Sequence, residues 1–288
     1  MTEVTLIPGD GTGPELVAAA RRVLDATGAS LEWDEHEAGE DAAASLARTT
    51  VALKGPSDPP DGGLAQGLDL FASVRPCRAY EGVRTRFPET NVVIVRENAE
   101  GTGLAFADEE RILRAAFHFA QDDGRHKVTA AGEAGHAIAE EYDGIEFQDR
   151  GVGALCSRLV TRPEEYDVIA LPRLYGDVAS DLAAGLVGGR GLAPGVHIGP
   201  DAAVFEATHG CAPWYAGQDK VNPTALLLCG VLMLRHLGEA DAGDRLEGAI
   251  AGVIRRGESV TYDLKPTRND PSAVGTSEFA DAVIEEMN

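Results

Sequence analysis

Short apolar runs alternate with longer helical stretches along most of this chain. The first run, residues 4–7, breaks at a glycine-rich turn, and Pro14 then begins a segment whose apolar residues recur at helical spacing. The alternation continues: apolar runs lie at 51–53, 92–95, 127–130 and 168–171, and helical stretches lie at 108–121, 178–187 and 223–237. Because strands separated by helices are typical of βαβ units, this pattern predicts an α/β fold with substantial parallel pairing.

Length and hydrophobic content narrow the class of protein. A chain of 288 residues suggests roughly two domains, and 44% hydrophobic residues is typical of a globular protein. No apolar run approaches the roughly 18 residues that a membrane span needs, and the first residues lack the basic and apolar regions of a signal peptide. We therefore expect a cytoplasmic protein with no membrane partner.

Charge and cysteine spacing exclude further functions. The chain has 47 acidic and 25 basic residues, a formal net charge of -22, which repels phosphate backbones and predicts no nucleic-acid partner. The four cysteines are far apart and form no C-x-x-C pair, which argues against a disulfide framework or a zinc site.

The first glycine-rich turn, Gly9-Asp10-Gly11-Thr12-Gly13, permits two interpretations. It follows a predicted strand and precedes a predicted helix, as a dinucleotide-binding turn does. However, its spacing is G-x-G-x-G, and no distinctive acidic residue follows about 20 positions later. A tight turn that lets the helix pack on its strand explains the glycines equally well.

Two carboxylates, Asp177 and Asp181, lie four residues apart after an apolar run and a glycine. On a helix this spacing places both on one face, and two hard oxygen ligands suit Mg²⁺ or Mn²⁺. The alternative is helix capping, in which Asp177 satisfies free N–H groups at the helix start. The residues alone do not decide between these interpretations.

A long polar loop spans residues 205–223. It offers His209, Tyr215, Lys220 and Asn222 just before an apolar helical stretch. Because so many hydrogen-bonding groups in one loop are unusual, we interpret it as a candidate site for an adenine and its phosphates.

Five segments, in this order along the chain, resemble the isocitrate/isopropylmalate dehydrogenase family: 7–15, 69–76, 95–101, 176–194 and 206–223. Residues 215–223 and 260–263 are most similar to its bacterial NADP-dependent isocitrate dehydrogenases. The resemblance implies two α/β domains with a nucleotide site that is not a Rossmann fold. A large nucleotide-binding domain would comprise 1–70 plus 188–288, and a small substrate and dimerisation domain 71–187. A homodimer is expected.

The resemblance also implies a reaction and its residues. A small 2-hydroxy acid is oxidised by hydride transfer to NADP⁺ or NAD⁺ and then loses CO₂ with the help of Mg²⁺ or Mn²⁺. By motif position, Arg75 and Arg96 match substrate-binding arginines, and Asp177 and Asp181 match metal ligands. Tyr215 and Tyr262 match positions that contact the 2′-phosphate of NADP. The full set of cofactor-binding positions is His209, Gly210, Ala212, Tyr215, Asn222 and Tyr262.

Several expected groups are replaced. Gly103 falls at the position of a tyrosine that protonates the enolate, and Glu133 at that of a lysine that reaches the partner's site. Ala65 and Gly153 stand where an arginine and a partner-directed metal aspartate are expected, while Trp214 and Pro266 fall at or near expected basic residues of the cofactor site.

The lysine replacement has a calculable consequence. Exchanging a cation for an anion at about 4 Å from a substrate carboxylate turns an attraction of about 4 kcal/mol into a similar repulsion, at an effective dielectric of about 20. We therefore expect an oxidoreductase of this family with impaired turnover. The alternative is a catalytically silent homologue that binds nucleotide or carboxylate as a regulatory or structural partner.

Overall fold

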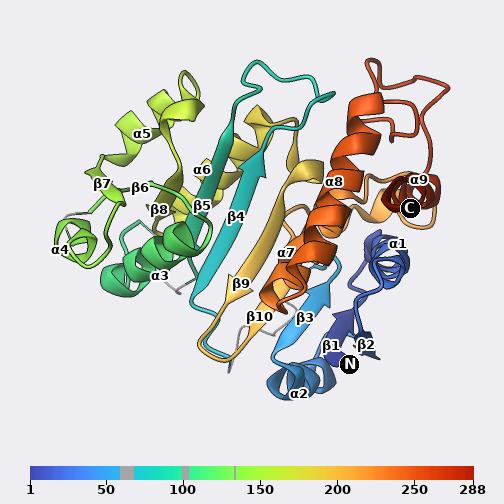
Figure 1. The fold of residues 1–288 in the computed structure, drawn as a ribbon, viewed down its shortest axis with the longest axis horizontal. Coiled ribbons are helices and arrows are strands. Elements are labelled where there is room, and N and C mark those ends of the chain that lie inside the picture. Colours follow the sequence, from blue (N-terminus) through green and yellow to red (C-terminus); the bar gives the residue numbers. More distant parts are fainter. Residues whose placement is uncertain (59–67, 99–103, 133) are drawn as a thin grey trace. The chain divides into compact units, whose positions relative to one another are not determined.

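In the computed structural model, residues 1–58, 68–98, 104–132 and 134–288 are described, and they form two compact units (Figure 1). Unit 1 comprises residues 1–69, 80–84 and 190–288, and unit 2 comprises residues 70–79 and 85–189. Both units contain strands and helices in alternation, which confirms the predicted α/β class.

Unit 1 has a mainly parallel set of strands in the order β2-β1-β3-β10-β9, of which only β9 runs antiparallel to its neighbour β10 among the described residues. The strands are β1 (Thr2–Ile7), β2 (Leu31–Glu35), β3 (Val51–Lys54), β9 (Pro194–Ile198) and β10 (Ala203–Ala207). Every residue of β3 is buried, as expected for a central parallel strand covered on both faces.

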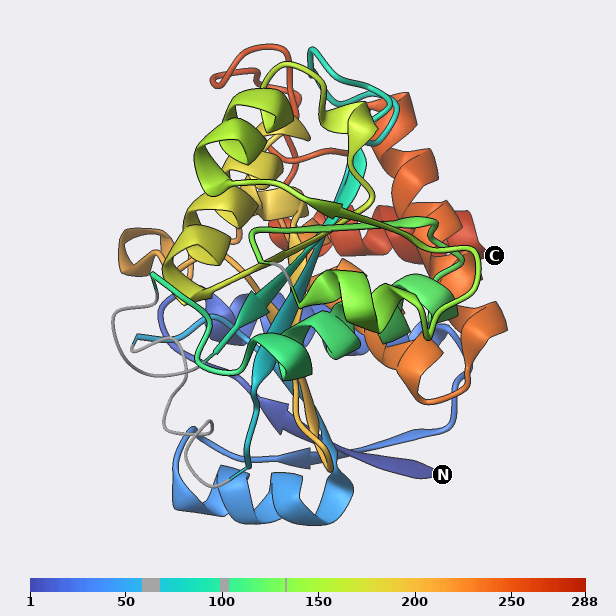
Figure 2. The same ribbon diagram turned by 90° about the vertical axis from the view of Figure 1, so that its left-hand side faces the viewer.

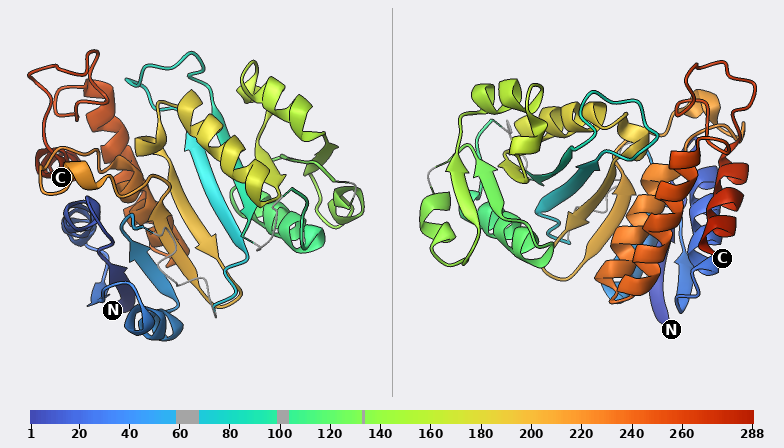
Figure 3. Two further views of the ribbon diagram at one scale, coloured as in Figure 1. Left: turned by 180° about the vertical axis from the view of Figure 1, so that it is seen from behind. Right: turned by 45° about the horizontal axis from the view of Figure 1, so that its top comes forward.

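The helices of unit 1 bury apolar stripes against these strands and against one another. They are α1 (Gly13–Ala26), α2 (Glu40–Thr49), α7 (Thr224–His236), α8 (Ala240–Arg256) and α9 (Thr276–Met287), with short 3₁₀ turns at Arg190–Leu192 and Pro213–Tyr215. Helix α2 packs along β1 and β3 (Figure 2), and α8 lies between α7 and α9 (Figure 3, right). Helix α7 is buried on nearly all sides, so it forms the centre of this helical layer.

Unit 2 has the strand order β4-β5-β8-β6-β7, with β4 antiparallel to β5 and the others parallel. The strands are β4 (Ala72–Arg78), β5 (Asn91–Glu97), β6 (Lys127–Ala130), β7 (Glu146–Asp149) and β8 (Val168–Leu171). The helices are α3 (Glu109–Asp122), α4 (Gly135–Ala139), α5 (Val152–Leu159) and α6 (Arg173–Leu186), with a 3₁₀ turn at Pro163–Glu165. Helices α3 and α6 cover opposite faces of the strands (Figures 1 and 3).

One helix differs from its prediction. The stretch expected at 178–187 begins at Arg173 instead, directly after Pro172, so Gly176 and Asp177 lie inside the helix. None of the helices in the described part of the chain is both long and apolar enough to cross a membrane.

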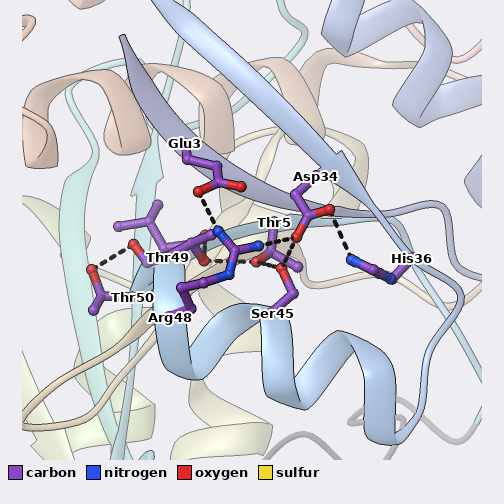
Figure 4. Close-up of polar contacts among 9 residues, drawn as sticks. Glu3, Thr5, Asp34, His36, Ser45, Arg48, Thr49 and Thr50 are labelled. Atoms are coloured by element: carbon purple, nitrogen blue, oxygen red, sulfur yellow. Dashed lines mark hydrogen bonds and ion pairs between the residues drawn. The ribbon is translucent and has the colours of Figure 1, made fainter.

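A polar network joins β1, β2 and α2 at the edge of unit 1 (Figure 4). The buried Thr5 hydroxyl lies 2.7 Å from the hydroxyls of both Ser45 and Thr49. Ser45 donates to Asp34 Oδ2 at 2.6 Å, and His36 Nε2 lies 2.9 Å from Asp34 Oδ1. These hydrogen bonds lower the pKa of Asp34 below its usual 3.8, and the bond from Ser45 has a larger effect than the bond from His36.

We expect Asp34→Asn to destabilise the protein near neutral pH but not in acid. A carboxyl whose pKa is lower in the folded state stabilises the fold above its unfolded pKa, and this contribution is lost as pH falls through the folded value. The free energies of unfolding of wild type and variant, measured with urea, should therefore converge as pH falls from about 7 to about 2. Ser45→Ala should weaken this pH dependence, whereas a constant difference across the range would contradict the assignment.

Candidate functional site

Three of the predicted site residues meet in unit 2. Arg75 lies on β4 and Arg96 on β5, and both reach the same carboxylate oxygen on α6: Arg96 Nη1 lies 2.7 Å and Arg75 Nη2 3.2 Å from Asp177 Oδ1. Asp181 lies one helical turn further along α6 and is exposed. The structure therefore places Arg75 and Arg96 at Asp177, and the i, i+4 spacing on α6 puts Asp181 on the same helix face as Asp177.

Arg96 is held tightly from several directions. Its side chain is only 9% exposed, and Nη2 donates to Asn98 Oδ1 at 2.6 Å. Gly176 makes room for it, because a Cβ at this position would lie 2.4 Å from Arg96 Cγ. Burial, together with repulsion from Arg75, lowers the pKa of Arg96 to about 10, so the guanidinium remains charged near neutral pH. Its buried Nε has no hydrogen-bond partner among the described residues.

Arg75 is fixed by hydroxyl groups. Nη1 donates to Ser180 Oγ at 2.6 Å, and Nε donates to Ser73 Oγ at 3.2 Å. Ser180 lies between Asp177 and Asp181 on α6, so this helix positions both the arginine and the carboxylates. Two guanidinium groups with fixed orientation can bind a carboxylate through charge-assisted hydrogen bonds.

The capping interpretation of Asp177 is wrong. Helix α6 begins four residues earlier, and the Asp177 side chain contacts two arginines rather than free N–H groups. Two carboxylates on one face fit Mg²⁺ or Mn²⁺, because Mg²⁺ is usually bound by one or two carboxylates with water and substrate oxygens. The described residues contain no cluster of three or more potential metal ligands, and Gly153, at the start of α5, contributes none.

The predicted cofactor loop follows β10 in unit 1. Thr12 donates to the carbonyl oxygen of Cys211 from both its amide, at 2.8 Å, and its hydroxyl, at 3.0 Å. Gly11 has a φ of 55°, and a Cβ there would lie 2.3 Å from the same oxygen. The glycine-rich turn thus packs against the loop, and the absence of a side chain at Gly11 permits this close approach.

His209, Gly210 and Asn222 lie within this loop. His209 Nδ1 lies 3.1 Å from the carbonyl oxygen of Gly210, and burial lowers the pKa of His209, which favours its neutral form. The buried Asn222 accepts hydrogen bonds from the amide and hydroxyl of Thr224, at 2.9 and 2.6 Å, and donates to Asp263 Oδ2 at 2.9 Å. Asn222 therefore fixes the start of α7. Ala212 adopts a left-handed conformation just before the Pro213–Tyr215 turn.

Tyr215 and Tyr262 lie side by side, with ring centroids 6.4 Å apart. Lys220 Nζ lies 5.4 Å and 5.1 Å from the two centroids, and Arg268 Cζ lies 5.8 Å from that of Tyr262. In the part of the chain that the structure describes, neither cation forms an ion pair with a carboxylate. We call these four residues the tyrosine–cation cluster.

Sequence reasoning missed Arg268. An arginine was expected near Pro266, and the structure places one two residues later, against the ring of Tyr262. The nearby basic residue was visible in the sequence, but only the folded loop shows which ring it faces.

A buried ion pair was also missed. Lys54, at the end of β3, is 1% exposed in its side chain, and its Nζ lies 2.5 Å from Glu206 Oε1 and 2.8 Å from Ser57 Oγ. Parallel pairing of β3 with β10 sets Lys54 directly beside Glu206. The only sequence signal is a lysine at the end of an otherwise apolar run, directly before Gly55.

Three replaced positions, Ala65, Gly103 and Glu133, lie outside the described residues. Their identities come from the sequence alone.

Comparison with known proteins gives a consistent result. The family model described as isocitrate/isopropylmalate dehydrogenase matches residues 3–109 and 103–283. The chain is 36% identical over 312 residues to the mitochondrial alpha subunit of NAD isocitrate dehydrogenase from Homo sapiens, covering 91% of this chain and 85% of that protein. It is 35% identical over 331 residues to a mitochondrial regulatory subunit of NAD isocitrate dehydrogenase from Dictyostelium discoideum, covering 99% and 93%. Both alignments are longer than this chain of 288 residues, so these relatives have insertions that it lacks.

Solved structures match equally well. The crystal structure of isocitrate dehydrogenase from Methylococcus capsulatus superposes with a TM-score of 0.89 at 39% identity, covering 100% of this chain and 99% of that one. The TT0538 protein from Thermus thermophilus gives a TM-score of 0.90 at 33% identity, covering 99% and 68%.

Proposed function

This chain belongs to the isocitrate/isopropylmalate dehydrogenase family, and on that premise we propose that it is an NAD(P)⁺-binding oxidoreductase with weakened oxidative decarboxylation of isocitrate or a related 2-hydroxy acid. The observation that carries the proposal is the convergence of Arg75 and Arg96 on Asp177. Two cations held by their own hydrogen bonds provide anchors for a substrate carboxylate.

Each retained residue has a defined task. Arg75 and Arg96 bind and orient the substrate carboxylates through their guanidinium groups. Asp177 and Asp181 would hold Mg²⁺ or Mn²⁺ together with water and substrate oxygens. When bound, the cation supplies charge stabilisation for the oxygen that develops negative charge.

Proton transfer is the weak part of this site. Gly103 has no side chain to protonate an enolate, and the charge of Glu133 opposes an anionic substrate. A positioned general acid or base contributes about 10²- to 10⁴-fold to a rate, so turnover should be slower than in family members that keep these groups.

We propose NADP⁺ as the preferred cofactor, although the human and Dictyostelium discoideum relatives are named as subunits of NAD isocitrate dehydrogenase. The tyrosine–cation cluster supports this choice, because Lys220 and Arg268 offer positive charge without a carboxylate partner in the described part of the chain. In a chain of net charge -22, such cations are suited to an anionic ligand such as a ribose 2′-phosphate. We further propose a homodimer; the relatives named as subunits support an oligomer.

A second candidate is a regulatory or structural partner that binds ligand without turnover. The Dictyostelium discoideum relative is named as regulatory, and it matches 99% of this chain. The replacements at Gly103 and Glu133 support the same candidate.

Absorbance at 340 nm separates these candidates. With isocitrate, Mg²⁺ or Mn²⁺ and either cofactor, at low and high salt, we expect slow formation of reduced cofactor that disappears in Asp177→Ala. Asp143→Ala, which removes an exposed carboxylate of unit 2 in the segment between α4 and β7, is the matched control. Thermal stabilisation by NADP⁺ without turnover would favour the second candidate. If the protein shows no turnover and is not stabilised by NADP⁺ or NAD⁺, both candidates are contradicted.

A further inference from the structure

The N-terminus of the last helix is capped by a residue from the cofactor loop. Asp219 Oδ1 accepts a hydrogen bond from the amide of Ser277 at 2.8 Å, and Oδ2 accepts one from its hydroxyl at 2.5 Å. The carbonyl oxygen of Asp219 also accepts from the amide of Thr276 at 3.2 Å. A carboxylate at this end of α9 satisfies free N–H groups and is stabilised by the helix dipole.

The loop is fastened at neighbouring points as well. Thr276 Oγ1 donates to the carbonyl oxygen of Val221 at 2.6 Å, and the amide of Asp219 donates to Glu15 Oε2, on α1, at 3.2 Å. A Cβ at residue 275 would lie 2.5 Å from the carbonyl oxygen of Asp219, so only glycine permits this close approach. Residues 219–221 are therefore clamped to the start of α9 from both sides of Lys220.

Asp219 also adopts an unusual backbone conformation. Its φ is 48°, in the left-handed region that non-glycine residues other than asparagine and aspartate rarely enter. Such a conformation is retained only where surrounding contacts enforce it, and here those contacts are the cap on α9 and the hydrogen bond to Glu15. The direction in which the chain enters Lys220 follows from this conformation.

We propose that Asp219 is a positioning residue that holds Lys220 over the rings of Tyr215 and Tyr262, and thereby sets the affinity for a phosphorylated ribose. This inference rests on the proposed cofactor-binding function. Lys220 Nζ lies 5.4 Å from the Tyr215 ring centroid and 5.1 Å from that of Tyr262, although lysine side chains have many alternative rotamers. Fixing the backbone at Asp219 reduces the entropy that Lys220 loses when it binds an anion.

The test measures nucleotide dissociation constants by calorimetry, at a temperature well below the melting temperature of every variant. The probes are NADP⁺, NAD⁺ and adenosine 2′,5′-bisphosphate. Asp219→Ala should weaken the two 2′-phosphorylated probes about tenfold and NAD⁺ less than about twofold. Asp219→Asn should recover most of the loss, because asparagine tolerates the left-handed conformation and keeps one acceptor oxygen.

Two further variants exclude a general loss of stability. Asp281→Ala, which removes the ion pair of α9 with Arg22, should leave the preference for NADP⁺ over NAD⁺ unchanged. In the background of Lys220→Gln, Asp219→Ala should cause no additional loss for the 2′-phosphorylated probes, since both variants remove the same contact.

Equal weakening of NADP⁺ and NAD⁺, an unchanged preference, or full additivity with Lys220→Gln would overturn the inference while leaving the proposed function intact. If the wild-type protein binds none of the three probes, the proposed function fails and the inference fails with it.

Discussion

Replacing Lys54 by methionine is expected to lower the free energy of unfolding by about 3–5 kcal/mol, because it leaves a largely buried carboxylate without its cation. The side chain of Glu206 is 11% exposed, and Lys54 Nζ lies 2.5 Å from its Oε1. Methionine fills a similar volume, so the decrease in the free energy of unfolding measures the effect of the buried carboxylate without its cation rather than the effect of a cavity. Urea unfolding at neutral pH measures the change.

Two comparisons identify the origin of this effect. Adding Glu206→Gln to Lys54→Met should recover part of the stability, because the remaining partner is then neutral. Lys127→Met is the matched control: Lys127 Nζ lies 4.0 Å from Glu146 Oε1, a carboxylate that is 68% exposed, and such pairs contribute about 0–1 kcal/mol. A loss in Lys54→Met no larger than that of the control would contradict the importance of the buried pair.

The second large effect is expected from Gly176→Ala. Alanine usually stabilises a helix relative to glycine, by about 0.5–1 kcal/mol. Here its Cβ would lie 2.4 Å from Cγ and 2.8 Å from Cβ of Arg96, atoms of a buried stem that cannot easily move. We expect a loss of about 1–3 kcal/mol in unfolding free energy. The displaced Arg96 should also reduce thermal stabilisation by isocitrate.

Gly185→Ala provides the matched control on the same helix. No atom lies within 4 Å of a Cβ at this position, so the substitution should leave stability unchanged or raise it by up to about 1 kcal/mol. Urea unfolding of the two variants compares the same chemical change in crowded and open surroundings. Similar stability changes in both would show that Gly176 is not needed for the placement of Arg96.

The start of α6 shows where sequence patterns mislead. The apolar pattern predicts a helical stretch that begins at residue 178, two residues after Gly176. In the structure this glycine lies within the helix because the stem of Arg96, from β5, occupies the space of its side chain. A contact between residues 80 positions apart thus determined a local feature that local propensity could not predict.

The strands and the cluster of Arg75, Arg96 and Asp177 were easier to predict from the sequence. The apolar runs at 127–130 and 168–171 match β6 and β8, because short buried parallel strands have a clear hydrophobic signature. Arg75, Arg96 and Asp177 were found because they lie in recognisable motifs. Lys54 and Arg268 were not identified as site residues, because the role of each depends on a distant segment. Lys54 lies beside Glu206 on β10, and Arg268 lies against Tyr262, whose ring is next to Tyr215.

The pairing of β3 with β10 has a consequence for biosynthesis. Residues 51–54 align with residues 203–206, so the central strand of unit 1 lacks one neighbour until about 150 further residues have been translated. During that interval the nascent chain presents an open, mostly apolar strand edge, which is a template for aggregation. Residues 70–79 and 85–189 contain the described strands of unit 2 and are translated before β10. Unit 2 can therefore fold while β3 is still without β10.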